Sequence, residues 1–264
     1  MIGPAPRPGL ASVTYRQLTA DDVVRLAVEA GLEAIEWAGD SHVPHGDLAQ
    51  ADRVADLCDD AGVLVCSYGS YYRAGHDDLE TADDVVRTAV RLGAPNIRIW
   101  AGQVGSADCA ADVRRRVADD VGGFAELASE QGISVSLEFH SDTLTDTLES
   151  TLRLLDDVAT RAGVIRPYWQ PAVGIGIGDA RRQVDSLLPL LTTVHVYAWT
   201  GEGVRLPLRA AEPLWRDVLT RLADATSDDG SERFALLEFV RDDDPGELRT
   251  EAATLREWLD EATG

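Results

Sequence analysis

Two glutamates, a histidine and a glutamine in this chain could together bind one divalent metal ion. Glu138 stands in VSLEFH, Gln170 in YWQP, His195 in VHVYAW and Glu238 in ALLEFV. A carboxylate flanked by apolar residues is costly to bury unless it is paired, hydrogen-bonded or bound to a metal. Carboxylate and amide oxygens with a single imidazole suit Mn²⁺, Mg²⁺ or Co²⁺ better than the thiolate sites of structural zinc do. We therefore expect one metal ion, Mn²⁺ first, with Mg²⁺, Co²⁺ or Zn²⁺ as alternatives.

The same glutamates could perform acid–base catalysis. Two carboxylates on opposite sides of a bound hydroxy-ketone can move protons to and from adjacent carbons. Glu138 and Glu238 are the candidate pair. Either could instead anchor a helix start or pair with Arg98 or Arg241, and Gln170 could be a structural hydrogen-bond partner. These alternatives remain open at the level of sequence.

Further polar and aromatic residues cluster at or just after the same apolar runs and are expected to line a substrate pocket. They are Glu36, Trp37, His42, His45, Tyr68, Arg73, Arg98, Trp100, His140, Tyr197 and Trp199. The spacing of His42 and His45 in HVPH resembles a metal pair, but pocket lining is favoured, and Asp47 could cap the next helix. Glu36 could be a third catalytic acid or an arginine partner. His140 could equally be structural.

Eight short apolar runs alternate with eight amphipathic segments, which is typical of repeated β/α units. The expected strands are Leu10–Thr14, Ala34–Trp37, Leu64–Tyr68, Asn96–Trp100, Ser134–Phe139, Arg166–Gln170, Thr193–Tyr197 and Phe234–Phe239. The expected helices are Ala20–Ala30, Leu48–Ala61, Thr81–Leu92, Ala111–Gln131, Leu144–Arg161, Arg181–Leu190, Pro213–Thr226 and Pro245–Ala262. Polar residues end most of the strands, which favours a single (β/α)8 TIM barrel over residues 1–264 rather than an open sheet.

Composition excludes several function classes. The net charge is −22, and all 24 basic residues are arginine, so Schiff-base lysine chemistry and a P-loop lysine are absent. The acidic balance disfavours nucleic-acid binding. The run Gly174–Gly178 reads GxGxG, which is not a dinucleotide fingerprint, and is expected to be a βα loop. Three cysteines without CxxC spacing, together with the lack of a membrane span and of a secretory signal, predict a cytoplasmic protein, and the sequence leaves a homo-oligomer open.

The stretches IEWAGDSHVPHGD, VSLEFHSDTLTDT, YWQP, VHVYAW and LEFV carry a family resemblance. From Leu10 to Leu259 the chain resembles the xylose-isomerase-like barrels, the sugar phosphate isomerases/epimerases. That superfamily includes tagatose and allulose epimerases, hydroxypyruvate isomerase, inosose dehydratase and endonuclease IV. The resemblance implies that Glu138, His195 and Glu238 bind the metal and that the two glutamates transfer protons. In the sugar epimerases of that superfamily, strand six usually supplies an aspartate where this chain has Gln170.

The predicted activity is therefore metal-dependent isomerisation or epimerisation of a small polyol or ketose, such as a sugar, a sugar phosphate or a related hydroxy-ketone, through an enediolate. A hydride shift of the xylose isomerase type is disfavoured because the chain has no lysine. The alternatives are a metal-dependent lyase or dehydratase acting through the same enolate, a non-catalytic sugar-binding barrel, and, less favoured by the charge, a phosphodiesterase similar to endonuclease IV.

Overall fold

The computed structural model describes residues 6–159, 165–225 and 231–263. Within these residues, eight parallel strands close into a barrel in the order β1 to β8. The strands are β1 (Arg7–Ala11), β2 (Ala34–Ala38), β3 (Leu64–Arg73), β4 (Asn96–Trp100), β5 (Ser134–Glu138), β6 (Ile165–Trp169), β7 (Thr193–Val196) and β8 (Phe234–Leu237). The predicted TIM barrel is thus confirmed, and the open-sheet alternative is excluded.

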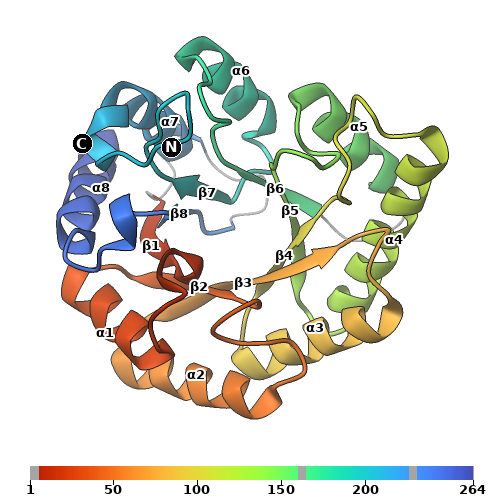
Figure 1. Cartoon of the computed structure of the whole chain (residues 1–264), viewed down its shortest axis with the longest axis horizontal. Coiled ribbons are helices and arrows are strands. Elements are labelled where there is room, and N and C mark those ends of the chain that lie inside the picture. The colour runs from red at the N-terminus through yellow and green to blue at the C-terminus, as the bar shows by residue number, and fades with distance from the viewer. Residues whose placement is uncertain (1–5, 160–164, 226–230, 264) are drawn as a thin grey trace. The chain divides into compact units, whose positions relative to one another are not determined.

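A helix follows each strand in the described part of the chain (Figure 1). The α-helices are α1 (Ala20–Ala30), α2 (Leu48–Ala61), α3 (Leu79–Leu92), α4 (Ala111–Ser129), α5 (Leu148–Val158), α6 (Ile177–Leu187), α7 (Glu212–Asp224) and α8 (Leu248–Thr263). The described residues also form three short 3-10 helices, η1 (Ser12–Tyr15), η2 (Leu208–Ala211) and η3 (Arg241–Asp243). None of the helices described is long and apolar enough to cross a membrane.

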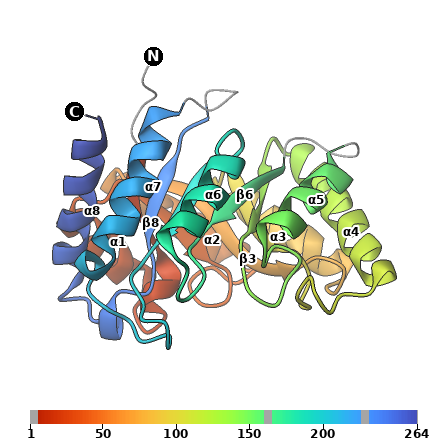
Figure 2. The ribbon, with the colours of Figure 1, turned by 90° about the horizontal axis from the view of Figure 1, so that it is seen from above.

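The chain divides into two compact units. Unit 1 comprises Met1–Glu36, Leu57–Leu64 and Trp169–Gly264, and unit 2 comprises Trp37–Asp56 and Val65–Tyr168. In unit 1, β1 pairs with both β2 and β8, β7 pairs with β8, and α8 packs against α1 and α7 (Figures 1 and 2). In unit 2, β4 pairs with β3 and β5, and α4 packs against α3 and α5. The expectation of one domain over residues 1–264 remains a prediction.

Close packing of β1 depends on a glycine. Gly9 pairs with Ala34 on one side and Leu236 on the other. A Cβ atom at this position would lie 2.5 Å from Leu236 Cδ2 and 2.7 Å from the Ala34 carbonyl oxygen. No side chain therefore fits here without movement of a neighbouring strand.

Element bounds differ from the prediction where tertiary contacts or capping decide them. The expected strand Leu10–Thr14 is wrong at its end, since Ser12–Tyr15 forms η1 and Thr14 there accepts a hydrogen bond from the Phe239 N–H. The helix expected from Leu144 begins at Leu148, because the Thr147 side chain caps it. The predicted end of that helix at Arg161 lies outside the described residues, as does the end at Thr226 of the helix expected from Pro213.

Candidate functional site

Unit 1 brings together three ionisable side chains, which lie within β2, near the end of β7 and directly after β8. Glu36, His195 and Glu238 have side chains that are 1–4% exposed. Nε2 of His195 lies 3.3 Å from Glu36 Oε1, and Nδ1 lies 3.5 Å from Glu238 Oε2. The imidazole therefore stands between two buried carboxylates, an arrangement that can bind and orient a divalent cation.

A strained turn fixes Glu238 in place. The Glu238 N–H donates to the Val196 carbonyl oxygen at 3.0 Å. The next residue, Phe239, has a φ of 52°, in the left-handed region that bulky residues avoid. Its N–H donates to Thr14 Oγ1 at 3.1 Å, and Thr14 is buried. Strain of this kind persists where surrounding contacts impose it, often at functional sites.

Glu138 lies in unit 2, at the end of β5, where it forms a buried ion pair. Arg98 and the Trp100 indole N–H both donate to its Oε2 atom. The side chains of Arg98 and Glu138 are 2% and 4% exposed. The Glu138 carbonyl oxygen accepts a hydrogen bond from Thr145 at 2.5 Å. The sequence alternative of an Arg98 partner for Glu138 is thus confirmed. Arg241, the other proposed partner, pairs with Asp242 and Glu247.

Aromatic rings gather around Trp100 in unit 2. His140 stacks on it with ring centroids 4.6 Å apart, and Tyr71 meets it edge-on at 5.4 Å. The Arg73 guanidinium carbon lies 4.5 Å from the Trp100 ring centroid. Arg73, Trp100 and His140, which sequence reasoning assigned to substrate binding, therefore form one cluster with the ion pair of Glu138.

Other predicted pocket residues make structural contacts. The Tyr68 hydroxyl donates to the Val43 carbonyl oxygen at 2.7 Å, and burial raises the pKa of this phenol, so it remains a donor at neutral pH. His42 is buried edge-on against Trp37, at 5.6 Å, whereas His45 is exposed. Asp47 caps α2 by accepting from the Gln50 N–H, as the capping alternative predicted. The substrate-binding roles of these residues remain predictions.

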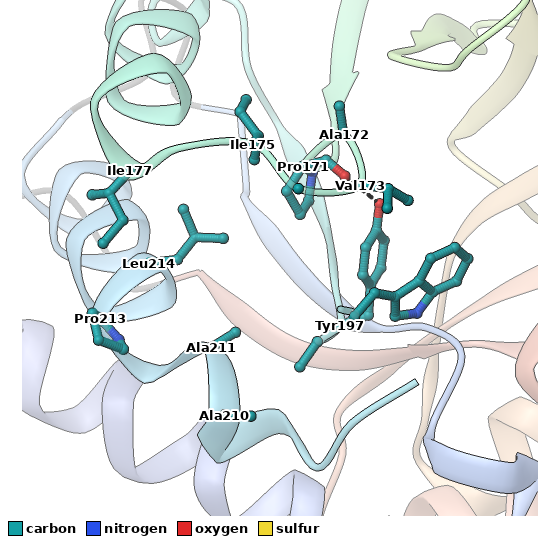
Figure 3. Close-up of a pocket in the computed structure, with 13 residues that line it drawn as sticks. Pro171, Ala172, Val173, Ile175, Ile177, Tyr197, Ala210, Ala211, Pro213 and Leu214 are labelled. Carbon is teal, nitrogen blue, oxygen red and sulfur yellow. Dashed lines mark hydrogen bonds between the residues drawn. The ribbon is translucent and has the colours of Figure 1, made fainter. Parts of the chain in front are cut away.

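A cavity of about 270 Å³ lies beside the end of β7 in unit 1 (Figure 3). Tyr197 and Trp199 form one side, and Gly174 and Ile175 of the predicted βα loop form another. The Tyr197 hydroxyl donates to the Pro171 carbonyl oxygen at 2.6 Å. Gln170, which directly follows β6 and is half-buried, was predicted as a metal ligand, and that role remains a prediction.

Glu138, His195 and Glu238 form a group of buried side chains able to hold a divalent metal ion. The donor set, two carboxylates and one imidazole, fits Mn²⁺, Mg²⁺ or Zn²⁺ and leaves coordination positions for water or substrate oxygens.

Sequence reasoning missed two other residues of this region, Thr14 and Arg205. No local pattern marks either, because their partners lie 225 and 38 residues away along the chain.

Comparisons with known proteins agree with this architecture. A family model described as "Xylose isomerase-like TIM barrel" matches residues 24–165. The chain belongs to this family. A 3-dehydroshikimate dehydratase of Bacillus anthracis is 28% identical over 159 residues, which are 56% of this chain and 56% of that protein. The match thus spans about half the length of this curated relative.

Solved structures of related barrels cover nearly all of the chain. A probable 3-DHS dehydratase involved in petrobactin synthesis from Bacillus anthracis has a TM-score of 0.78 at 21% identity, covering 95% of this chain and 98% of its own. D-allulose 3-epimerase from Methylomonas sp. has a TM-score of 0.71 at 15% identity, covering 98% and 100%. At these identities the similarity shows the fold only, and any proposal about the reaction has to be argued from the site residues.

Proposed function

We propose that the chain is a divalent-metal-dependent dehydratase that removes water from a β-hydroxy ketone through an enolate, with 3-dehydroshikimate as the first substrate to test. The observation that carries this proposal is the buried group of Glu138, His195 and Glu238. The named activity of the Bacillus anthracis relative supports dehydration over isomerisation. The sequence alone favoured isomerisation or epimerisation and gave dehydration as an alternative, and the proposal reverses this order.

When bound, the metal would polarise the substrate carbonyl and so acidify the adjacent C–H bond. Glu138, His195 and Glu238 would hold it. We assign Glu238 as the base that takes the proton next to the carbonyl. Breakage of that C–H bond forms an enolate, and expulsion of the β-hydroxyl, protonated by the same carboxyl group, forms a C=C bond and water. Arg98 and Trp100 hold Glu138 in a fixed orientation during this step.

The product follows from the substrate. Loss of one water from 3-dehydroshikimate, followed by enolisation of the ring ketone, gives aromatic 3,4-dihydroxybenzoate. Aromatisation makes the reaction effectively irreversible and gives the product a distinct ultraviolet spectrum.

The test is incubation of the protein with 3-dehydroshikimate in Mn²⁺, Mg²⁺ or EDTA, with 3,4-dihydroxybenzoate followed by absorbance and chromatography. We expect product with metal, none with EDTA, and a loss of at least about 100-fold in kcat for Glu238→Gln. Glu257→Gln is the matched control, because Glu257 is a half-exposed glutamate that pairs with Arg209. Absence of product from the metal-loaded wild type would refute the dehydratase assignment.

Isomerisation or epimerisation of a ketose is the second candidate, because Glu138 and Glu238 could serve as the proton-transfer pair of that reaction. It predicts deuterium incorporation from D₂O into a recovered ketose, together with a new isomer. Dehydration predicts neither with ketoses that form no aromatic product. A panel of ketoses assayed in D₂O with Mn²⁺ therefore separates the two activities.

A further inference from the structure

The segment after β7 folds back on itself and brings Arg205 beside an aromatic cluster of unit 1. Trp199 and Arg205 form an antiparallel bridge. The Leu206 N–H donates to the Ala198 carbonyl oxygen at 2.8 Å, and the Thr200 N–H donates to that of Val204 at 2.8 Å. In a β/α barrel the segments that follow the strands lie at the face used for catalysis. Arg205 is therefore held at the same end of β7 as His195.

Arg205 lies over an aromatic face. Its guanidinium carbon is 4.8 Å from the ring centroid of Phe239, the residue directly after Glu238. The Phe239 ring in turn lies 5.4 Å from that of Trp199, and Trp199 lies 5.1 Å from Tyr197. Three aromatic rings and the Arg205 guanidinium thus form a cluster on the segments that follow His195 and Glu238.

The Arg205 guanidinium keeps hydrogen-bonding capacity. Its Nη1 atom donates to Asp243. Among the residues that the structure describes, no acceptor takes a hydrogen bond from its Nε or Nη2 atoms, and the side chain is 27% exposed. Asp243 is itself held, because its N–H donates to the Val240 carbonyl oxygen and its own carbonyl oxygen accepts from Gln17. Asp243 therefore fixes one edge of the guanidinium and leaves the other edge for a ligand.

We propose that Arg205, Trp199 and Phe239 form a subsite for a planar ring that carries a carboxylate. A guanidinium edge matches the two oxygens of a carboxylate, and aromatic faces stack on a flat ring. A chain with a net charge of −22 repels anions at long range, so an anionic substrate needs a positioned cation at the mouth. This inference rests on the proposed function and extends it, because it names the group that would orient a substrate such as 3-dehydroshikimate.

The alternative is that Arg205 only fastens the segments after β7 and β8 through Asp243. A purely structural role predicts that Asp243→Asn and Arg205→Gln behave alike. A ligand-binding role predicts that they differ, since Asp243→Asn keeps the guanidinium and Arg205→Gln removes it.

The experiment is calorimetric titration of benzoate, 3,4-dihydroxybenzoate and benzamide into the full chain with Mg²⁺, with urea midpoints measured for every variant. We expect the wild type to prefer each carboxylate over benzamide by about 10- to 100-fold, the range for charge-assisted hydrogen bonds. Arg205→Gln should abolish this preference. Asp243→Asn should retain it, as should the control Arg209→Gln, whose arginine is 53% exposed and pairs with Glu257.

An unchanged preference in Arg205→Gln would overturn the proposal, and so would its equal loss in Asp243→Asn. Because binding is measured without turnover, the result is independent of the dehydratase assay. An Arg205-dependent preference in a protein that forms no 3,4-dihydroxybenzoate would keep the subsite and discard the proposed function. If turnover is present, Arg205→Gln should raise KM by about 10-fold or more and change kcat less.

Discussion

Replacement of Arg98 by methionine tests the buried ion pair that positions Glu138. The two side chains are 2% and 4% exposed, so removal of the arginine leaves a carboxylate buried without its cation. Loss of one partner of a buried pair costs about 3–5 kcal/mol in the free energy of unfolding. Methionine preserves most of the length of the arginine stem, so the cavity contribution stays small. We expect this loss in urea denaturation with EDTA present.

The matched control is Arg91→Met. Arg91 pairs with Asp52 on the surface of the same unit, with side chains 50% and 39% exposed. Such pairs contribute about 0–1 kcal/mol. In the double variant Arg98→Met/Glu138→Gln, where no buried charge remains, we expect recovery of much of the loss. Equal losses in Arg98→Met and Arg91→Met would refute the assignment of Glu138 as a buried charge held by Arg98.

Metal should offset part of the same loss. When its free concentration is about 100 times its Kd, an ion that binds only the folded protein adds roughly 2.7 kcal/mol to the free energy of unfolding. Without Arg98, Glu138 would have the metal as its compensating cation. The difference in unfolding free energy between wild type and Arg98→Met should therefore be smaller in saturating Mn²⁺ than in EDTA. If the difference in unfolding free energy is the same in Mn²⁺ and in EDTA, Glu138 does not bind the metal in addition to pairing with Arg98.

Further predictions concern unit 1 and α4. Thr14→Val should weaken Mn²⁺ affinity by about 10-fold, as losses of ligand-supporting contacts do, and Thr14→Ser should restore it, because the Phe239 N–H after Glu238 needs an acceptor. Burial raises the pKa of Glu251. The contribution of this carboxyl group to stability is therefore present below its ordinary pKa and is lost as the pH rises through the raised pKa. Urea titrations should show that Glu251→Gln becomes more stable relative to the wild type as the pH increases from 4 to 7. Gly9→Ala should cost about 1–3 kcal/mol through the strand clash, whereas Gly123→Ala, on an open helix position, should gain about 0.5–1 kcal/mol.

The barrel and the group at its strand ends could be predicted because they depend on local patterns. Glu138 and Glu238 each interrupt an apolar run, and His195 does the same in VHVYAW. Residues at the carboxyl ends of barrel strands reach one common face, so the position of each residue along its predicted strand indicates where it lies. Where caps are local, as at Thr19, whose side chain accepts from the Asp22 N–H, the helix start was also predicted correctly.

Features that depend on partners far away along the chain could not be predicted from the sequence. Thr14 was expected to end a strand, and its place in η1 is linked to a hydrogen bond from Phe239, 225 residues away. The left-handed φ values of Phe239, Asp242 and Asp243 have no glycine to mark them. Arg205 could not be linked to Asp243 from composition or spacing, because that pairing exists only once the segments after β7 and β8 are folded.

Calorimetric titration of Mn²⁺ into EDTA-treated protein tests the central claim, a single metal held by Glu138, His195 and Glu238, most directly. We predict one ion per chain for the wild type and an affinity reduced by at least about 100-fold in Glu138→Gln, His195→Asn and Glu238→Gln, since each replaces a carboxylate or imidazole ligand with a weaker neutral amide. Glu257→Gln should bind like the wild type. Equal affinity in all four variants, or no binding by the wild type, would contradict the account.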